Sequence, residues 1–235
     1  MATVILVRHG RTTANASGIL AGRAGGVLLD DFGREQAART AERLAVVPLS
    51  AIVSSPLERC QQTSAILFDL QQGAALRLDE NDLTECDYGQ WQGRPLAELA
   101  KEPLWSVVQN KPSEVTFPGG ESMQAMQNRA VSAIRRHDAA IEAEFGPASV
   151  WVAVSHGDVI KSIIADALGM NLDHFQRINI NPASVSIVRY GQERPSVLAT
   201  NTDAGDLSWL RTAAPSADAV VGGGAGNQTT QASRS

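Results

Sequence analysis

Short apolar runs alternate along the chain with longer segments in which apolar residues recur every three or four positions. The runs predict buried strands, and the longer segments predict amphipathic helices. Strands are predicted over residues 3–8, 51–54, 74–78, 150–155, 184–190 and 197–201. Helices are predicted over residues 33–47, 56–70, 96–101, 104–109, 122–145 and 158–168. This alternation predicts an α/β fold of three layers, with a mostly parallel, doubly wound sheet and helices on both of its faces.

Changes in the pattern of apolar and polar residues divide the chain into a domain, an insertion within it and a C-terminal tail. Residues 1–211 are expected to form one domain. Within it, residues 81–118 are polar, irregular and interrupted by prolines, and a long insertion of this kind is usually functional. We expect it to form a cap over a binding site. Residues 212–235 consist mainly of Ala, Ser, Gly, Gln and Thr, which predicts a low-complexity, disordered tail.

The composition narrows the range of partners. The chain has 235 residues and a formal net charge of −5, which disfavours a general nucleic-acid surface. A membrane span is not expected, because no run of about 18 apolar residues occurs. The N-terminus does not resemble a signal peptide, and the two cysteines form no metal or redox motif. We therefore expect a cytoplasmic protein that binds a small molecule, and a homo-oligomer stays open.

Two histidines directly follow predicted strands. The apolar run 4–7 leads through Arg8 to His9 and Gly10, and the apolar run 150–154 leads through Ser155 to His156 and Gly157. Ligand sites of open α/β sheets lie beyond the carboxyl ends of the strands, and glycine lets a ligand approach the backbone. Either histidine alone is more often structural. A metal site would need further ligands, and the remaining histidines, His137 and His174, have no suitable spacing.

Charged residues accompany the histidines. Arg8 adjoins His9, and Arg59 follows the strand at 51–54, so a cationic pocket suited to phosphate is predicted at this edge of the sheet. Read alone, Arg59 would be a surface ion pair; Arg11 and Arg23 are weaker candidates at the rim. Glu85 lies among aromatic residues and glycines and is a candidate proton donor. Read alone, Glu85 is more often a solvated loop acid, and Glu80, Asp82 and Asp87 are equally eligible on spacing.

Five segments, in order along the chain, resemble the motifs of the histidine phosphatase superfamily, which includes the cofactor-dependent phosphoglycerate mutases. They are residues 6–12 (LVRHGRT) with Asn15, residues 54–63 (SSPLERCQQT), the set Leu83, Glu85, Gly89, Trp91 and Gly93, residues 118–122 (PGGES) and residues 154–157 (VSHG). The resemblance implies a phosphoglycerate mutase-like fold for the domain.

The resemblance also implies roles for single residues. His9 would attack phosphorus and carry a phosphohistidine, with Glu85 as proton donor. Arg8, Arg59 and His156 would bind the phosphoryl oxygens, and Asn15 and Gly157 would complete the substrate-binding set. Histidine as the nucleophile divides one difficult step into two easier ones. Neither a metal nor another cofactor is expected, because the arginines and His156 would supply the charge.

Departures from the family pattern bear on the reaction. Position 11 is Arg where many relatives have Glu. Many relatives also have a Gly-x-x-Asp-x-x-Leu-Thr stretch, and the corresponding residues 22–30 (GRAGGVLLD) are without the Asp of that pattern. The dedicated mutases have a pair of arginines downstream of the acid motif for the substrate carboxylate, and residues 101–118 contain no arginine. We therefore predict a metal-independent phosphomonoester hydrolase. The alternatives are a cofactor-dependent phosphoglycerate mutase or related phosphomutase, a non-catalytic phosphate-binding protein and a metal-dependent hydrolase.

Overall fold

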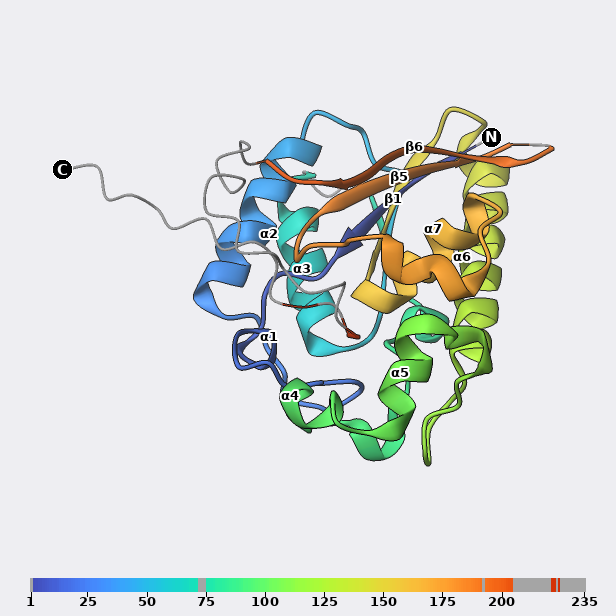
Figure 1. Cartoon of the computed structure of the whole chain (residues 1–235). Coiled ribbons are helices and arrows are strands. Elements are labelled where there is room, and N and C mark those ends of the chain that lie inside the picture. Colours follow the sequence, from blue (N-terminus) through green and yellow to red (C-terminus); the bar gives the residue numbers. More distant parts are fainter. Residues whose placement is uncertain (1, 72–74, 192, 205–220, 223, 225–235) are drawn as a thin grey trace.

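A computed structural model describes residues 2–71, 75–191, 193–204, 221, 222 and 224 (Figure 1). Its strands form one sheet in the order β3-β2-β4-β1-β5-β6. They are β1 (Thr3–Arg8), β2 (Ala51–Ser54), β3 (Leu76–Asp79), β4 (Val150–Ser155), β5 (Val185–Tyr190) and β6 (Pro195–Thr202). The first four positions in this order are parallel, whereas β5 and β6 run antiparallel at one edge. The α/β class with a mostly parallel sheet is confirmed.

The helices begin and end close to the predicted positions, except for the short helix Thr13–Ala16, which was not predicted. They are α1 (Thr13–Ala16), α2 (Asp31–Leu44), α3 (Glu58–Asp69), α4 (Leu96–Leu99), α5 (Pro103–Asn110), α6 (Met123–Phe145) and α7 (Gly157–Ala167). Helix α2 begins two residues before the predicted start, because the Asp30 carboxylate caps it by accepting from the Gly33 amide at 2.7 Å. The prediction that Pro56 opens the next helix is wrong, since α3 begins at Glu58.

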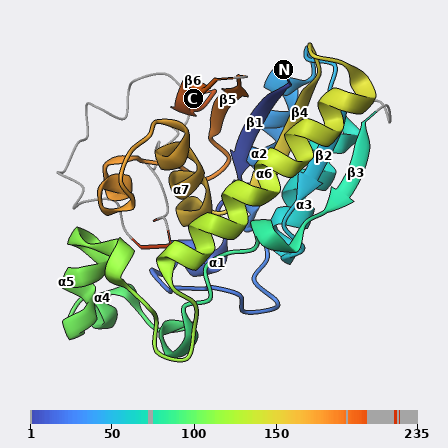
Figure 2. The ribbon, with the colours of Figure 1, turned by 90° about the vertical axis from the view of Figure 1, so that its right-hand side faces the viewer.

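Alternate residues of the central strands enter two separate hydrophobic cores. Val4 and Leu6 belong to the core shared with α6 and α7, and Ile5 and Val7 belong to the core shared with α2 and α3. Successive strand residues point to opposite faces, so a strand buried on both faces needs an unbroken apolar run. The helices accordingly cover both faces, as Figure 2 shows with α6 in front of the strands and α2 and α3 behind them.

The register of the sheet brings the two histidine motifs together. Strands β1 and β4 are adjacent and parallel, with Arg8 opposite Ser155. The residues that follow these two positions are His9 and His156, and the His9 amide donates to the Ser155 carbonyl at 3.0 Å. Both histidines therefore follow strands that end at the same edge of the sheet, and β1 ends near α1 (Figure 1).

The insertion predicted at 81–118 packs against the loop between β1 and α2. It carries α4, α5 and three short 3-10 turns, Asn81–Leu83, Gly89–Trp91 and Pro112–Glu114. Backbone hydrogen bonds join the two segments: Leu20 donates to Arg94 at 3.0 Å, Gly93 to Leu20 at 2.7 Å and Leu96 to Gly18 at 2.8 Å. The insertion thus lies across the carboxyl end of the parallel strands (Figure 1).

The tail predicted at 212–235 lies mostly outside the described residues. Three of its residues are described, and of these Val221 is 1% exposed and belongs to the core with α6 and α7. The Gly222 amide donates to the Asp158 carboxylate at 2.9 Å. These contacts place a short piece of the tail beside the histidine motifs. Within the described part of the chain, the helices are too short or too polar to span a bilayer.

Candidate active site

His9 is held in one orientation and one tautomer. Its Nδ1 lies 2.7 Å from the Gly10 carbonyl, and because a carbonyl only accepts, Nδ1 carries the proton. The other ring nitrogen, Nε2, is then unprotonated in the neutral ring. Burial lowers the pKa of His9 well below its usual value, and the nearby charges of Arg59 and Arg8 lower it further. His9 therefore presents a neutral imidazole with a free lone pair at neutral pH.

Gly10 is also needed for the packing of the backbone. A Cβ at position 10 would collide with the backbone of Gly33, and a Cβ at Gly33 would collide with the backbone of Arg11. The start of α2 thus packs directly against the backbone of Gly10 and Arg11. This contact restricts the position of His9, which precedes them in the sequence.

His156 lies next to His9 and is fully buried. The two ring centroids are 5.3 Å apart at an interplanar angle of 61°. His156 Nε2 lies 2.8 Å from the Ser55 hydroxyl, which comes from the turn after β2. Burial is the largest cause that lowers the pKa of His156 well below its usual value, and Arg59 adds to it. The ring is accordingly neutral at physiological pH.

Arg8 and Arg59 bring positive charge to the same place. Arg8 is 1% exposed and donates from Nη1 to the Ile180 carbonyl at 2.8 Å. Burial lowers its pKa to about 10, so the guanidinium stays charged at neutral pH. Arg59 donates from Nη2 to the Gly22 carbonyl at 2.7 Å, while its Nη1 is buried with no hydrogen-bond partner among the described residues. A buried, unpaired donor of this kind is suited to an anionic ligand.

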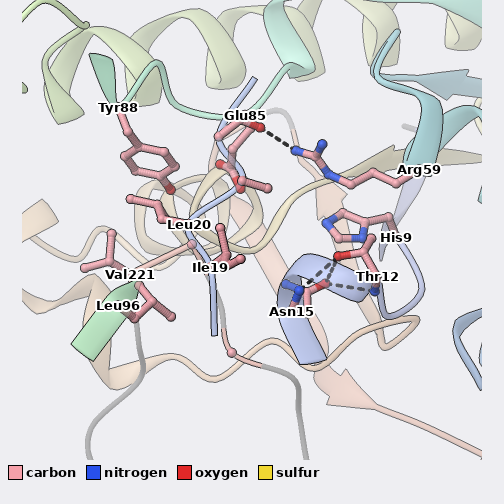
Figure 3. A pocket seen from close by; sticks show the side chains of 14 residues that line it. His9, Thr12, Asn15, Ile19, Leu20, Arg59, Glu85, Tyr88, Leu96 and Val221 are labelled. Atoms are coloured by element: carbon pink, nitrogen blue, oxygen red, sulfur yellow. Dashed lines mark hydrogen bonds between the residues drawn. The ribbon is translucent and has the colours of Figure 1, made fainter. Parts of the chain in front are cut away.

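Glu85 lines the same pocket as His9 and Arg59, and its side chain faces that space (Figure 3). The residue is 3% exposed. Burial raises the pKa of Glu85 to about 7, and the negative charge of Asp158 contributes, although Arg59 and the hydrogen bond from the Cys86 amide oppose the shift. A carboxyl group with this pKa can donate a proton near neutrality and take one back.

The backbone of Glu85 is fixed by an ion network. Its carbonyl accepts from Arg23 Nε at 2.8 Å and from Arg129 Nη2 at 3.1 Å. Both arginines also pair with the Glu121 carboxylate, at 2.8 and 2.6 Å. Glu121 comes from the segment 118–122, so this motif holds the acid loop in place. Arg23, expected only at the rim, supports Glu85 from the first loop.

Replacement of Glu121 by glutamine is expected to lower the free energy of unfolding by about 1–3 kcal/mol, because two partly buried guanidinium groups lose their counter-charge. Urea denaturation measures this change. The matched control is Glu114→Gln, which breaks an exposed pair with Lys111 and should change stability by less than about 0.5 kcal/mol. Equal effects of the two substitutions would contradict the supporting role of the network.

Of the remaining predicted site residues, some line the pocket and others do not. Asn15 lines the pocket, and it forms a capping box with Thr12 at the start of α1. Gly157 is the first residue of α7, where backbone amides lack partners within the helix. Arg8, His156 and Gly157 are not among the residues that line the pocket itself. Arg11 pairs with Asp30 at 2.8 Å.

Several residues that support the site could not be identified clearly from the sequence. Ser55 contacts His156, and Thr63 accepts from the Gly10 amide at 3.2 Å. The Tyr88 hydroxyl donates to Asp158, which also pairs with the buried Lys161. Ser55 and Thr63 stand inside the recognised segment 54–63, which is the one hint that pointed to them.

The pocket therefore brings together a neutral imidazole, the Arg59 guanidinium and a carboxyl group that titrates near neutrality, and the charge of Arg8 also acts on His9. The described residues contain no group of three or more His, Cys, Asp or Glu side chains placed to hold a metal ion. This set suits the transfer of a phosphoryl group, in which positioning and charge stabilisation dominate.

Comparison with known families agrees with this geometry. Residues 4–203 match the model of the histidine phosphatase superfamily (branch 1). The chain belongs to this superfamily. The recognition made from the motifs is thereby confirmed, and the fold is that of a histidine phosphatase.

Relatives of this histidine phosphatase carry different names. It is 32% identical to "Probable phosphoglycerate mutase GpmB" of an Enterobacter species, over 89% of this chain and 95% of that one. It is 28% identical to phosphoserine phosphatase 1 of Hydrogenobacter thermophilus, over 86% and 92%. The structure of the alpha-ribazole phosphatase from Shigella flexneri is similar with a TM-score of 0.74 and 26% identity, over 87% and 98%. The chain spans about half the length of three mycobacterial relatives that it also matches.

Proposed function

We propose that this chain is a metal-independent phosphomonoester hydrolase that works through a phosphohistidine on His9. The observation that carries the proposal is the pairing, in one pocket, of a His9 imidazole with a free Nε2 and a Glu85 carboxyl group with a pKa of about 7. One group is ready to attack phosphorus and the other is ready to protonate the leaving oxygen. The substrate is then a small phosphorylated metabolite.

Two steps complete the reaction. In the first, His9 Nε2 forms a bond to phosphorus, the bond from phosphorus to the ester oxygen breaks, and Glu85 gives its proton to that oxygen. In the second, the Glu85 carboxylate takes a proton from water, the water oxygen attacks phosphorus, and the bond to Nε2 breaks. Inorganic phosphate leaves, and both side chains return to their starting states.

Arg8 and Arg59 act on the phosphoryl oxygens in this proposal. Their charges stabilise the negative charge that spreads over these oxygens in the transition state. His156, Asn15 and the Gly157 amide at the start of α7 would complete the binding set, since helix N-termini favour anions. Ser55 would hold the His156 ring in place.

A phosphoglycerate mutase or related phosphomutase is the second candidate, supported by the name of the Enterobacter relative. A mutase must hold a carboxylated acceptor while the phosphohistidine waits. The decisive test compares phosphate release with isomerisation of 3-phosphoglycerate in one preparation, with and without 2,3-bisphosphoglycerate. Phosphate release in the absence of the bisphosphate supports the hydrolase, and isomerisation that is faster by orders of magnitude contradicts it.

Phosphatase activity is expected to be unchanged by excess EDTA and by added magnesium or zinc. The physical reason is that Arg8 and Arg59 already provide the positive charge that a metal ion would otherwise bring to the phosphoryl oxygens. Initial rates with p-nitrophenyl phosphate after dialysis against the chelator measure this. Loss of activity on chelation, with recovery on metal addition, would place the chain in another mechanistic class.

The cytoplasmic location, the absence of a nucleic-acid partner and the open question of a homo-oligomer stay expectations from the sequence. The function proposed here depends on none of them.

A further inference from the structure

The pocket beside His9 has two unlike walls. His9, Thr12, Asn15 and Arg59 form the polar wall where a phosphoryl group would sit. The opposite wall is aliphatic and consists of the side chains Ile19, Leu20, Leu96 and Val221. Figure 3 shows these four together on the side away from His9 and Arg59, with Tyr88 and Glu85 above them. An ester bound through its phosphate would direct its alcohol portion toward the aliphatic wall.

This aliphatic wall is a fixed part of the fold. Ile19 and Leu20 lie in the segment that is joined to residues 93–96 by backbone hydrogen bonds, so the first loop and the insertion form one surface. Leu20 is 2% exposed and Val221 is 1% exposed. The Gly222 amide, bound to Asp158, holds Val221 in position from the other side. The wall is therefore held by contacts from three separate parts of the chain.

Three arginines of the first loop and the insertion are paired with carboxylates of the chain. Arg11 contacts Asp30 at 2.8 Å, Arg23 contacts Glu121 at 2.8 Å, and Arg94 contacts Glu102 at 2.7 Å. Each of these charges is offset by a carboxylate of the chain itself, and none of the three arginines lines the pocket.

The polar groups near the aliphatic wall either already form a hydrogen bond within the chain or carry negative charge. The Tyr88 hydroxyl donates to Asp158. Among the described residues, the charged side chains that line the pocket are Arg59 and Glu85. A second anionic group on a substrate would thus be desolvated without a partner and close to Glu85, which is unfavourable.

We propose that the aliphatic wall is the subsite for the leaving alcohol and selects esters whose alcohol is small, uncharged and largely aliphatic. Esters that carry a carboxylate or a second phosphate are selected against. The empty space of the pocket is about 390 Å³ with the open space at its mouth included, which favours a small alcohol. This inference rests on the proposed phosphatase function.

The test compares two esters of equal chain length, propyl phosphate and the phosphate ester of 3-hydroxypropanoate. The carboxylated ester is expected to have a kcat/KM at least about 100-fold lower, because its charge is left without a partner. 3-Phosphoglycerate and phosphoserine should be poor substrates for the same reason. Equal rates for the matched pair, or a preference for the carboxylated ester, would overturn the inference.

Two variants place a cation in the wall. Leu96→Arg and Ile19→Lys should each raise the relative kcat/KM for the carboxylated ester by about tenfold, the effect of one charge-assisted hydrogen bond. The matched control is Leu28→Arg, which adds the same charge at an exposed position of the first loop and should leave the ratio unchanged. An equal rise in the control and the wall variants would contradict the subsite. The comparison of esters on the unaltered chain decides the question even where a variant fails to fold.

The outcome separates this inference from the proposed function. Absence of phosphate release from every ester, p-nitrophenyl phosphate included, would contradict the phosphatase function itself. Rapid release from p-nitrophenyl phosphate together with a preference for carboxylated esters would contradict only the aliphatic subsite.

Discussion

Replacement of His9 by alanine is expected to lower the rate of phosphate release by a factor on the order of 10⁴–10⁶, the scale on which loss of a nucleophile acts. The covalent route closes because no other described imidazole in the pocket offers an unprotonated nitrogen in this place. After incubation with a labelled phosphate ester and denaturation without acid, the variant should carry no covalently bound label. The wild-type chain should retain a label that is lost in acid, as a phosphoramidate bond is.

The fold of the variant is expected to persist, since the backbone around position 9 is held by β4 and by the start of α2. The matched control is His174→Ala, which removes an exposed histidine from the 3-10 turn Leu172–Arg177 and should leave the rate unchanged. Rapid turnover by the His9 variant, with an acid-labile phosphoenzyme still present, would show that another residue carries the phosphoryl group.

Replacement of Glu85 by glutamine is expected to lower kcat for alkyl phosphates by about 10²–10⁴-fold, the usual size of general acid catalysis. Esters of good leaving groups, such as p-nitrophenyl phosphate, should lose much less in the first step because their oxygen needs little protonation. Glu98→Gln is the matched control, since it removes an exposed carboxylate from α4 in the same insertion. Equal losses for both kinds of ester would contradict the role of Glu85 as proton donor.

The same residue sets the pH dependence. The pKa of Glu85 is raised to about 7, so the protonated donor predominates below that pH and is lost above it. The rate of the leaving-group step for alkyl phosphates should therefore fall as the pH rises through about 7. The pKa of His9 is lowered well below its usual value, so the nucleophile stays unprotonated into the acidic range. A pH profile of kcat/KM with the optimum on the acidic side of neutrality is expected, and Glu85→Gln should remove its alkaline limb.

The sequence alone was sufficient for the buried strands and for the place of the histidines. Strands β1 and β4 are buried on both faces, which requires unbroken apolar runs, and such runs are visible without a structure. A polar residue that ends such a run has to emerge at the edge of the sheet. His9 and His156 were therefore located from the pattern, and the adjacency of β1 and β4 brings them together.

The tertiary structure was needed to distinguish Glu85 from its neighbours. Glu80 pairs with Arg136 and His137, and the Asp87 carboxylate accepts from the Gly89 amide, whereas Glu85 is buried in the pocket. Nothing in local periodicity separates these acids, because their environments depend on arginines distant in the sequence. The same holds for Val221, whose place in the pocket wall depends on contacts with residues far along the chain. Strand patterns are local and can be read from the sequence, but burial of a loop residue is set by segments that meet only in the folded chain.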